Sequence, residues 1–361
     1  MTRIAFLIAG LHNGAGMERV LTVRLNKLSQ YMDVTAITHG QGSRPDFFPL
    51  DKRVRRIDLA GDNVEYRHQL TQLLTERRYD ITVSTGGTEF FFLHKIKDGS
   101  KKIFEFHFSF DIAKVWVSPE VRGFRRWRYI QQQTWHRIYH ARKYDQVVVL
   151  CKTDYKKWRR YCRHVTYIYN PLTIEACRTS LCSSKRAIAV GRLNYQKGFD
   201  YLIEAWAKVT SKHPDWKLDI YGEGEEREHL QGMIDNGGLS GVIALKGQTD
   251  DIAEKYAESS IFILSSRDEA FGLVITEAEA CGLPVVAFNC PSAPAELVAD
   301  GVNGFIVGKV GDTTDMARKI CLLIEDEGLR QSMGRASVEF SRQFSADSIT
   351  EKWQDLYKMC K

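Results

Sequence analysis

The sequence has no apolar run long enough to cross a membrane. A spanning helix needs roughly 18 to 20 consecutive apolar residues, and no segment of the 361-residue chain approaches that length. The apolar run that begins at Ile4 is short, ends in a Gly-rich turn and has no small-residue cleavage site, so we do not expect a signal peptide. We therefore expect a cytoplasmic protein, attached at most to the inner face of the cell membrane.

The sequence also lacks CxxC pairs and the cysteine spacing of zinc sites. Disulfides are not expected in a chain of this size with an ordinary composition of 43% hydrophobic and 27% charged residues. Several of the eight cysteines lie in apolar contexts, as free core thiols do: Cys151, Cys162, Cys177, Cys182, Cys281, Cys290, Cys321 and Cys360. These features favour a reducing, cytosolic compartment.

Charge divides the chain into two halves, although the net charge is only +6. Residues 1–170 carry 30 Lys/Arg against 16 Asp/Glu, whereas residues 171–361 carry 21 against 29. The length is sufficient for two domains with full-sized cores. A polar, cysteine-containing connector from Asn170 to Ser184 has no clear periodicity, so we place the domain boundary there. The two lobes are expected to have different partners.

Short apolar runs alternate with helical stretches in the first half, which indicates a doubly wound α/β domain. The expected strands are residues 4–9, 34–38, 81–84, 103–106 and 147–150. Ligands of such a sheet bind at the carboxyl ends of its strands. Three stretches fall there: the loop Gly14-Ala15-Gly16, the turn Thr85-Gly86-Gly87, and His107. His107 could instead be a histidine in an aromatic-lined loop that makes one backbone hydrogen bond.

Residues 114–163 mix basic and large aromatic side chains. This mixture suits an anionic, partly apolar surface such as a lipid headgroup layer, and it would also suit a nucleic-acid backbone. A solvated helix face above core aromatics is the third possibility. The residues are Trp116, Phe124, Trp127, Tyr129, Trp135, Tyr139, Trp158 and Tyr161 with Arg122, Arg125, Arg126, Arg128, Arg137, Arg142, Lys143, Lys156, Lys157, Arg159, Arg160 and Arg163.

A second series of strands follows the connector, at residues 187–190, 218–221, 242–245, 261–264, 285–288 and 305–307. Its first turn runs from Gly191 to Gly198 and carries two cations, Arg192 and Lys197, just before a helix at 199–210. Such cations can reach a diphosphate from one side. The strand ends near Gly222 and Gln248 are expected to line the same crevice.

The stretch from Ser266 to Ala278 combines a turn, a helix start and two carboxylates. A helix that begins near Gly272 directs free backbone N–H groups and a positive dipole end into the cleft, which makes a phosphate site. Glu269 in the turn and Glu277 inside the helix can face one cleft from different depths. One could hold sugar hydroxyls and the other a ribose. The alternative is a capped surface helix with solvated acids.

Taken together, these motifs are similar to one family of enzymes. The chain resembles the retaining glycosyltransferases of family 4, which have the GT-B fold, and most of all the bacterial enzymes that build capsular, O-antigen and other lipid-linked glycans. The resemblance runs from Ile4 to about Tyr357. Its motifs are Gly191-Arg192 followed by Lys197-Gly198, Glu269 and Glu277 spaced as E-x7-E, Cys281-Gly282-Leu283-Pro284-Val285-Val286, and Asp300-Gly301-Val302-Asn303-Gly304.

The resemblance implies two Rossmann-like doubly wound domains that face a deep interdomain cleft. Residues 1–170 would bind the acceptor, with a C-terminal helix at 345–361 packed back on them, and residues 171–344 would bind the nucleotide sugar. The implied activity is retaining transfer of a hexose or N-acetylhexosamine, with a UDP-sugar as the expected donor. The implied acceptor is a lipid-linked or growing surface polysaccharide.

The resemblance also implies roles for individual residues. Arg192 and Lys197 would bind the donor diphosphate, Glu269 would hold the sugar near its 3- and 4-hydroxyls, and Glu277 would hold the ribose. The remaining expected contacts are the amides of Phe271, Gly272 and Leu273 at the sugar phosphate, His107 at the sugar, Gly222 and Gln248 at the base, and the loops at Gly14, Ala15, Gly16 and Gly191.

Two loops depart from the family pattern. The family usually has a consecutive GGxER, whereas this chain has Gly14-Ala15-Gly16-Met17-Glu18-Arg19. Cys290 is followed by Pro291-Ser292-Ala293-Pro294, where Gly-Pro is common. Both departures concern fine loop geometry and not the reaction.

The leaving group of a nucleotide sugar departs with two negative charges, so fixed cations and a helix end lower the barrier. The sequence has no DxD, the usual carboxylate pair that holds a divalent metal on a diphosphate. We therefore expect no metal and no other cofactor, with front-face attack on the sugar. Double displacement would need a carboxylate about 3 Å from the anomeric carbon, and Glu269 is the one candidate.

Two other functional classes remain open. The basic aromatic lobe could take a nucleic acid as acceptor, which would make the protein a DNA-modifying transferase. The chain could also be a non-catalytic sugar-nucleotide-binding protein. We expect an anionic membrane surface as the partner of the basic lobe, and no nucleic acid.

Overall fold

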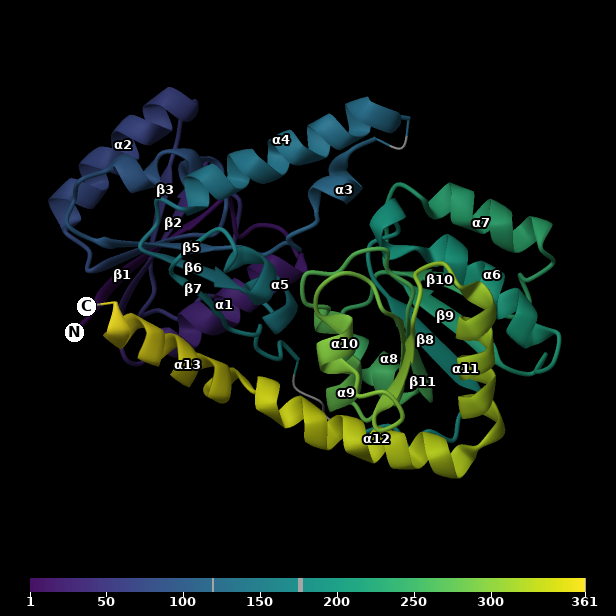
Figure 1. The fold of residues 1–361 in the computed structure, drawn as a ribbon. Helices are drawn as coiled ribbons and strands as arrows, with labels where there is room; N and C mark the ends of the chain where they lie inside the picture. Colours follow the sequence, from purple (N-terminus) through teal and green to yellow (C-terminus); the bar gives the residue numbers. More distant parts are fainter. Residues whose placement is uncertain (119, 175–177, 361) are drawn as a thin grey trace. The chain divides into compact units, whose positions relative to one another are not determined.

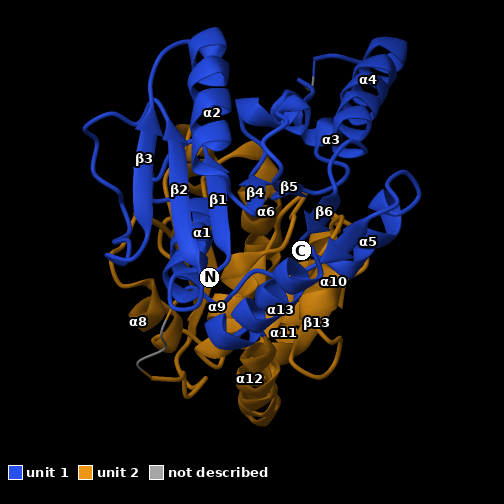
Figure 2. Cartoon of the chain, turned by 90° about the vertical axis from the view of Figure 1, so that its left-hand side faces the viewer, with its two compact units in different colours: residues 1–173, 344–361 blue, residues 174–343 orange. Residues whose placement is uncertain are grey.

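The computed structural model describes residues 1–118, 120–174 and 178–360, which form two compact units. Unit 1 comprises residues 1–173 and 344–361, and unit 2 comprises residues 174–343 (Figure 2). The chain therefore returns to unit 1 through its last helix. Cys177, one of the eight cysteines, lies outside the described residues.

Unit 1 is built on a parallel sheet with the strand order β3-β2-β1-β4-β5-β6-β7 (Figure 1). Its strands are β1 (Arg3–Ile8), β2 (Asp33–His39), β3 (Arg55–Leu59), β4 (Ile81–Ser84), β5 (Lys101–Glu105), β6 (Gln146–Val149) and β7 (Val165–Tyr167). The sequence did not indicate β3 and β7, which lie at the two edges of the sheet and are largely half-buried. An edge strand needs no continuous apolar run, whereas the central strands are buried on both faces.

The helices of unit 1 alternate with these strands. They are α1 (Gly16–Leu28), α2 (Asn63–Arg77), α3 (Ala113–Trp116), α4 (Gly123–Ala141), α5 (Lys152–Trp158) and α13 (Ala346–Met359), with 3-10 turns at Thr88–Phe91 and Leu93–Lys95. Helix α13 packs against α1. Trp353 and Tyr357 on α13 are fully buried, so the end of the chain completes the core of the unit in which the chain begins.

Unit 2 repeats this architecture with the strand order β10-β9-β8-β11-β12-β13. Its strands are β8 (Arg186–Val190), β9 (Lys217–Tyr221), β10 (Ile243–Gly247), β11 (Ile261–Leu264), β12 (Val285–Phe288) and β13 (Gly304–Val307). Its helices are α6 (Phe199–Thr210), α7 (Arg227–Asn236), α8 (Ile252–Ala257), α9 (Leu273–Ala280), α10 (Pro294–Leu297), α11 (Thr313–Glu325) and α12 (Glu327–Ser341), with 3-10 turns at Tyr195–Lys197 and Arg342–Phe344.

The pairing in each sheet places the loops that carry the candidate residues at one edge. In unit 2, β8 pairs in parallel with β9 and with β11, so the loops that follow these strands emerge together. In unit 1, β1, β4 and β5 are neighbours in the same way. Among the described residues, no helix is long and apolar enough to cross a membrane.

Candidate functional site

The centre of the candidate site in unit 2 is an ion pair between the loops after β8 and β11. The Lys197 ammonium lies 2.5 Å from Oε1 of Glu269. The Ser266 hydroxyl donates a hydrogen bond of 2.7 Å to the same oxygen. Only 20% of the Lys197 side chain and 8% of the Glu269 side chain are exposed, so the pair is shielded from solvent. The structure thus brings together a cation and an acid that lie 72 residues apart in the sequence.

Two glycines permit the close packing of these loops. Gly198 has a φ of +62°, and a Cβ there would lie 2.3 Å from the Ser265 carbonyl oxygen. Gly222, after β9, has a φ of +140°, and a Cβ there would lie 1.9 Å from the Gly191 carbonyl oxygen. A side chain would therefore clash at either position, and Gly222 has a backbone conformation that L-residues rarely adopt. This requirement explains two glycines of the sequence motifs.

A second ion pair braces the same loops. Arg267, next to Ser266, binds Asp200 on α6 through two hydrogen bonds of 2.9 and 2.6 Å. The Arg267 guanidinium also lies 4.1 Å from the ring centres of Tyr195 and Tyr201. Bidentate pairs of this kind fix geometry as well as charge. Sequence reasoning missed this brace, because nothing in the spacing of Arg267 and Asp200 links them.

Helix α9 begins where the sequence predicted a helix. Gly272 precedes it with a φ of +87°, and Phe271 is buried beneath it. The first N–H groups of a helix have no partner within the helix, so this end, with Leu273 at its first position, can bind an anion. Glu277 is also buried, and Oε2 of Glu277 accepts a hydrogen bond of 3.4 Å from the Tyr256 hydroxyl of α8.

The remaining residues predicted for unit 2 lie around this centre. Arg192 is exposed in the loop after β8, and its side chain makes no ion pair with a described residue. Gly191 packs against the Lys197 side chain, because a Cβ at Gly191 would lie 3.2 Å from the Lys197 Cδ. Gly222 donates a backbone hydrogen bond of 2.8 Å to the carbonyl of Gly247, which places Gln248 beside it in an exposed position.

The Asp300–Gly304 motif has a structural role in this unit. The Asn303 amide donates to Oε1 of Glu279 at 2.8 Å, and the Asn303 carbonyl oxygen of the side chain accepts from the Ala299 N–H at 2.7 Å. Glu279 is fully buried, and burial raises the pKa of its carboxyl well above the ordinary value. Glu279, on the same helix as Glu277, is therefore a buried, hydrogen-bonded core group and not a ligand-binding acid.

Unit 1 holds His107 in a network that the sequence did not predict. The His107 ring lies 3.2 Å from Oε1 of Glu105. Both oxygens of Glu105 also bind the Arg24 guanidinium of α1, at 2.5 and 2.6 Å. All three side chains are nearly or fully buried. Burial raises the pKa of Glu105, but the charges and hydrogen bonds of Arg24 and His107 together outweigh it and lower that pKa to about 2. An acid inside the apolar run 103–106 was the signal that a buried cation must lie nearby.

The other predicted loops of unit 1 lie at the same edge as His107. Gly14, Ala15 and Gly16 are exposed between β1 and α1. Thr85 follows β4, and its N–H and hydroxyl both donate to the Leu7 carbonyl, at 3.2 and 2.8 Å. The strands that end at these loops are neighbours in the sheet. The structure thus groups the predicted residues of unit 1 at the carboxyl edge.

The structure divides the basic aromatic segment into two sets. Phe124, Trp127, Trp135 and Tyr139 are exposed on α4. Trp158 is fully buried, and the buried guanidinium of Arg137 donates to the Phe110 carbonyl at 2.8 Å. Lys157 is held by Asp111 at 2.6 Å. These last three side chains therefore make contacts within unit 1, which agrees in part with the third possibility, a solvated helix face above core aromatics.

Comparison with known proteins shows the fold and relates part of the chain to a family of enzymes. Residues 183–340 match the family model of the glycosyl transferases group 1. This match covers most of unit 2. The chain is 29% identical to an uncharacterised glycosyltransferase of Haemophilus influenzae, over 99% of this chain and 100% of that protein. It is 33% identical to the amylovoran biosynthesis glycosyltransferase AmsD of Erwinia amylovora, over 47% of each chain, so it spans about half the length of AmsD.

A solved structure with the same fold is that of TarM from S. aureus, in a complex with UDP, fondaparinux and α-GlcNAc-glycerol. The TM-score is 0.80 at 16% sequence identity, over 99% of this chain and 100% of that chain. The fold class expected from the sequence, two Rossmann-like α/β domains of the GT-B type, is confirmed. The chain thus has the expected fold, and most of unit 2 is similar to the family model of the glycosyl transferases group 1.

Proposed function

We propose that this protein is a retaining glycosyltransferase that moves a hexose or N-acetylhexosamine from a UDP-sugar to a lipid-linked or growing surface polysaccharide. The observation that carries the proposal is the grouping of Arg192, the Lys197–Glu269 pair and the start of α9 at one edge of the unit 2 sheet. The UDP in the TarM complex supports the donor, and the name of AmsD, an amylovoran biosynthesis glycosyltransferase, supports a biosynthetic transfer of this kind.

In this proposal the diphosphate lies between Arg192, Lys197 and the amides of Phe271, Gly272 and Leu273. These groups stabilise the two negative charges that the leaving group acquires, which lowers the barrier. Because protein cations and a helix end supply this stabilisation, the donor site needs no divalent metal. Glu277 holds the ribose, and the base lies against the loops at Gly222 and Gln248.

Glu269 binds sugar hydroxyls in the proposal and does not attack the anomeric carbon. Its Oε1 already carries the Lys197 ammonium and the Ser266 hydroxyl, and both contacts reduce the nucleophilicity of that oxygen. A front-face route fits this arrangement, because the departing phosphate can accept the proton of the acceptor. Within unit 1, His107, which lies beside the Glu105–Arg24 pair, and the loop Gly14-Ala15-Gly16 are proposed as substrate-binding residues.

The exposed side of α4 is proposed as the surface that meets the membrane in which a lipid-linked acceptor lies. Phe124 and Trp127 stack at 5.5 Å between their ring centres, and both are more than half exposed. Arg122, Arg125 and Arg128 are exposed beside them. Aromatic rings with adjacent basic side chains suit the boundary between headgroups and acyl chains.

The test is transfer with a donor chosen by a thermal-shift screen across nucleotide sugars, since selective binding raises the melting temperature. Replacing Lys197 or Arg192 by alanine should lower transfer by at least about 100-fold, the effect of removing a preorganised charge-stabilising group. Lys185→Ala, an exposed lysine just before β8, is the control and should leave transfer unchanged. Near-normal turnover in either site variant would contradict the assigned roles, and loss of transfer on chelation would contradict metal independence.

A further inference from the structure

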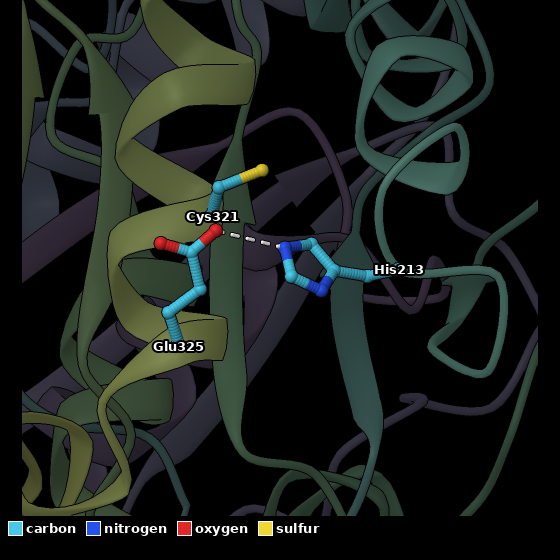
Figure 3. A group of neighbouring side chains, drawn as sticks. All are labelled: His213, Cys321 and Glu325. Atoms are coloured by element: carbon cyan, nitrogen blue, oxygen red, sulfur yellow. Dashed lines mark hydrogen bonds and ion pairs between the residues drawn. The ribbon is translucent and has the colours of Figure 1, made fainter.

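A second cluster of ligand-type side chains lies at the opposite edge of the unit 2 sheet. His213, Cys321 and Glu325 each place one donor atom within 4.8 Å of the others (Figure 3). His213 lies between the end of α6 and the start of β9, and Cys321 and Glu325 lie on the last turns of α11. The amino ends of the strands form this edge, whereas the proposed donor site lies at their carboxyl ends. The cluster is therefore separate from the transfer site.

The backbone positions of the three residues are set by contacts that involve none of their side chains. Cys321 and Glu325 are four residues apart on one helix, so they share a face. The His213 N–H donates to the Val209 carbonyl at 2.9 Å, and the His213 carbonyl accepts from the Trp216 N–H at 3.2 Å. Helices α6 and α11 pack together, and the Lys208 ammonium of α6 binds the Thr313 hydroxyl of α11 at 2.8 Å. The cluster is thus preorganised.

The donor atoms are an imidazole nitrogen, a thiol sulfur and a carboxylate oxygen. Zn²⁺ is bound by these three atom types at about 2.0 to 2.3 Å in tetrahedral geometry, which puts neighbouring ligand atoms roughly 3.3 to 3.8 Å apart. His213 Nε2 and Glu325 Oε1 are 3.0 Å apart, so small side-chain rotations suffice to admit an ion. Glu325 is 54% exposed and His213 20% exposed, which leaves a path for entry.

We propose that His213, Cys321 and Glu325 form a Zn²⁺ site with three protein ligands and a fourth position for water. The ion replaces the hydrogen bond between His213 and Glu325 and joins the α6–β9 connection to the end of α11. Its effect is on the stability of unit 2 and not on the chemistry of sugar transfer. The spacing of the three residues along the chain hides the site from sequence analysis, because one ligand lies more than 100 residues from the other two.

The test is titration of the full chain with Co²⁺, which reports its ligands by absorption. We expect one Co²⁺ per chain, with visible bands of tetrahedral intensity and a near-ultraviolet thiolate-to-cobalt band, all removed by competing Zn²⁺. Cys321→Ser should abolish the thiolate band, and His213→Asn and Glu325→Gln should each weaken binding at least about tenfold. Cys360→Ser, a part-exposed cysteine of unit 1, is the control and should change neither spectrum nor affinity.

Cys321 is buried, so Cys321→Ser could prevent folding. His213 is part-exposed, so the variant His213→Asn should still fold and can test the site in that case. A melting temperature raised by Zn²⁺ in the parent and the Cys360→Ser variant, and unchanged by Zn²⁺ in His213→Asn, supports the site. An unchanged thiolate band in Cys321→Ser, or equal Co²⁺ affinity of the parent and His213→Asn, overturns it. A Co²⁺ spectrum without a thiolate band in the parent chain overturns it as well.

Discussion

At the scale of single residues, Lys197 is neutralised by Glu269 before any donor is bound. The 2.5 Å contact is shielded from water, where an ion pair is stronger than at an exposed surface. A donor diphosphate must therefore compete with Glu269 for the ammonium, or share it. This competition links the binding of the leaving group to the carboxylate that is proposed to hold the sugar.

The variant Glu269→Gln separates two proposed roles of Glu269, the binding of the sugar and the ion pair with Lys197. The amide keeps the shape of the side chain and can accept from Ser266, but it removes the charge that holds Lys197. We expect transfer to fall at least about tenfold, because a hydrogen bond to a charged group is roughly twice as strong as one to a neutral group. UDP affinity should be kept or raised, since Lys197 is released for the diphosphate.

The measurement is the initial rate of transfer together with calorimetric titration with UDP. Glu204→Gln, at an exposed position on α6, is the control and should change neither. Loss of UDP affinity as large as the loss of rate would mean that Glu269 and Glu277 have been assigned the wrong way round.

The burial of Glu279 leads to a second prediction, on how the stability of unit 2 depends on pH. Its folded pKa is raised well above the ordinary value by burial, so the folded protein holds a proton that the unfolded chain releases above a pH of about 4.5. The unfolded state then binds fewer protons, and stability falls as pH rises from that value toward the folded pKa. In Glu279→Gln, which is neutral at every pH, the urea midpoint of unit 2 should fall less steeply between about pH 5 and pH 8. Equal slopes in the two proteins would show that Glu279 is ionised in the fold.

At the scale of elements, helix α4 is one amphipathic segment with two functions. Its inner side contributes Arg137 and Ile138 to the core of unit 1, and its outer side exposes Phe124, Trp127 and the arginines of its first turns. A helix whose exposed side is rich in aromatic rings is unusual unless another surface covers it. The sequence showed the composition of this segment, but the division of its residues between core and surface depends on the direction in which each side chain points.

We therefore predict that Arg125→Gln with Arg128→Gln weakens binding to anionic vesicles by roughly 30-fold at low salt, because each basic side chain near such a surface contributes about 1 kcal/mol. Trp127→Ala should weaken binding with little change in salt dependence. The charge-matched control is Arg77→Gln with Lys97→Gln, both exposed residues of unit 1 outside α4. Equal losses of vesicle binding in the two charge variants would exclude a specific membrane-binding surface on α4.

The nucleic-acid alternative has its own test. Binding to duplex DNA with a steep salt dependence, and not to vesicles, would favour a nucleic-acid acceptor.

At the scale of the whole molecule, unit 1 is discontinuous in sequence, because α13 supplies part of its core. The Arg24 guanidinium lies 4.3 Å from the centre of the Trp353 ring, which joins α13 to the buried pair with Glu105. The last helix therefore supports the residues that orient His107. The two ends of the chain are coupled through this contact.

Trp353→Ala should lower the free energy of unfolding of unit 1 by about 3 to 5 kcal/mol, as expected for a large aromatic side chain removed from a core. The measurement is denaturant unfolding followed by probes in each unit. Met359→Ala, on the exposed side of the same helix, is the control and should change stability by less than about 0.5 kcal/mol. Unfolding of unit 1 at an unchanged denaturant concentration in Trp353→Ala would contradict this account of α13.

The sequence was sufficient to predict the central strands, helix α9 that follows Gly272, and the two cations of the Gly191–Gly198 loop. These features depend on periodicity and turn chemistry, which are local properties of the chain. The edge strands β3 and β7 could not, since a half-solvated strand needs no continuous apolar run. The partners of charged residues were likewise decided by tertiary structure alone. Lys197 and Glu269 meet because β8 and β11 are neighbours, and Arg24 on α1 meets Glu105 on β5 inside the core of unit 1. Sequence determined which groups could bind a sugar nucleotide, and parallel pairing in the sheets decided which of them lie together.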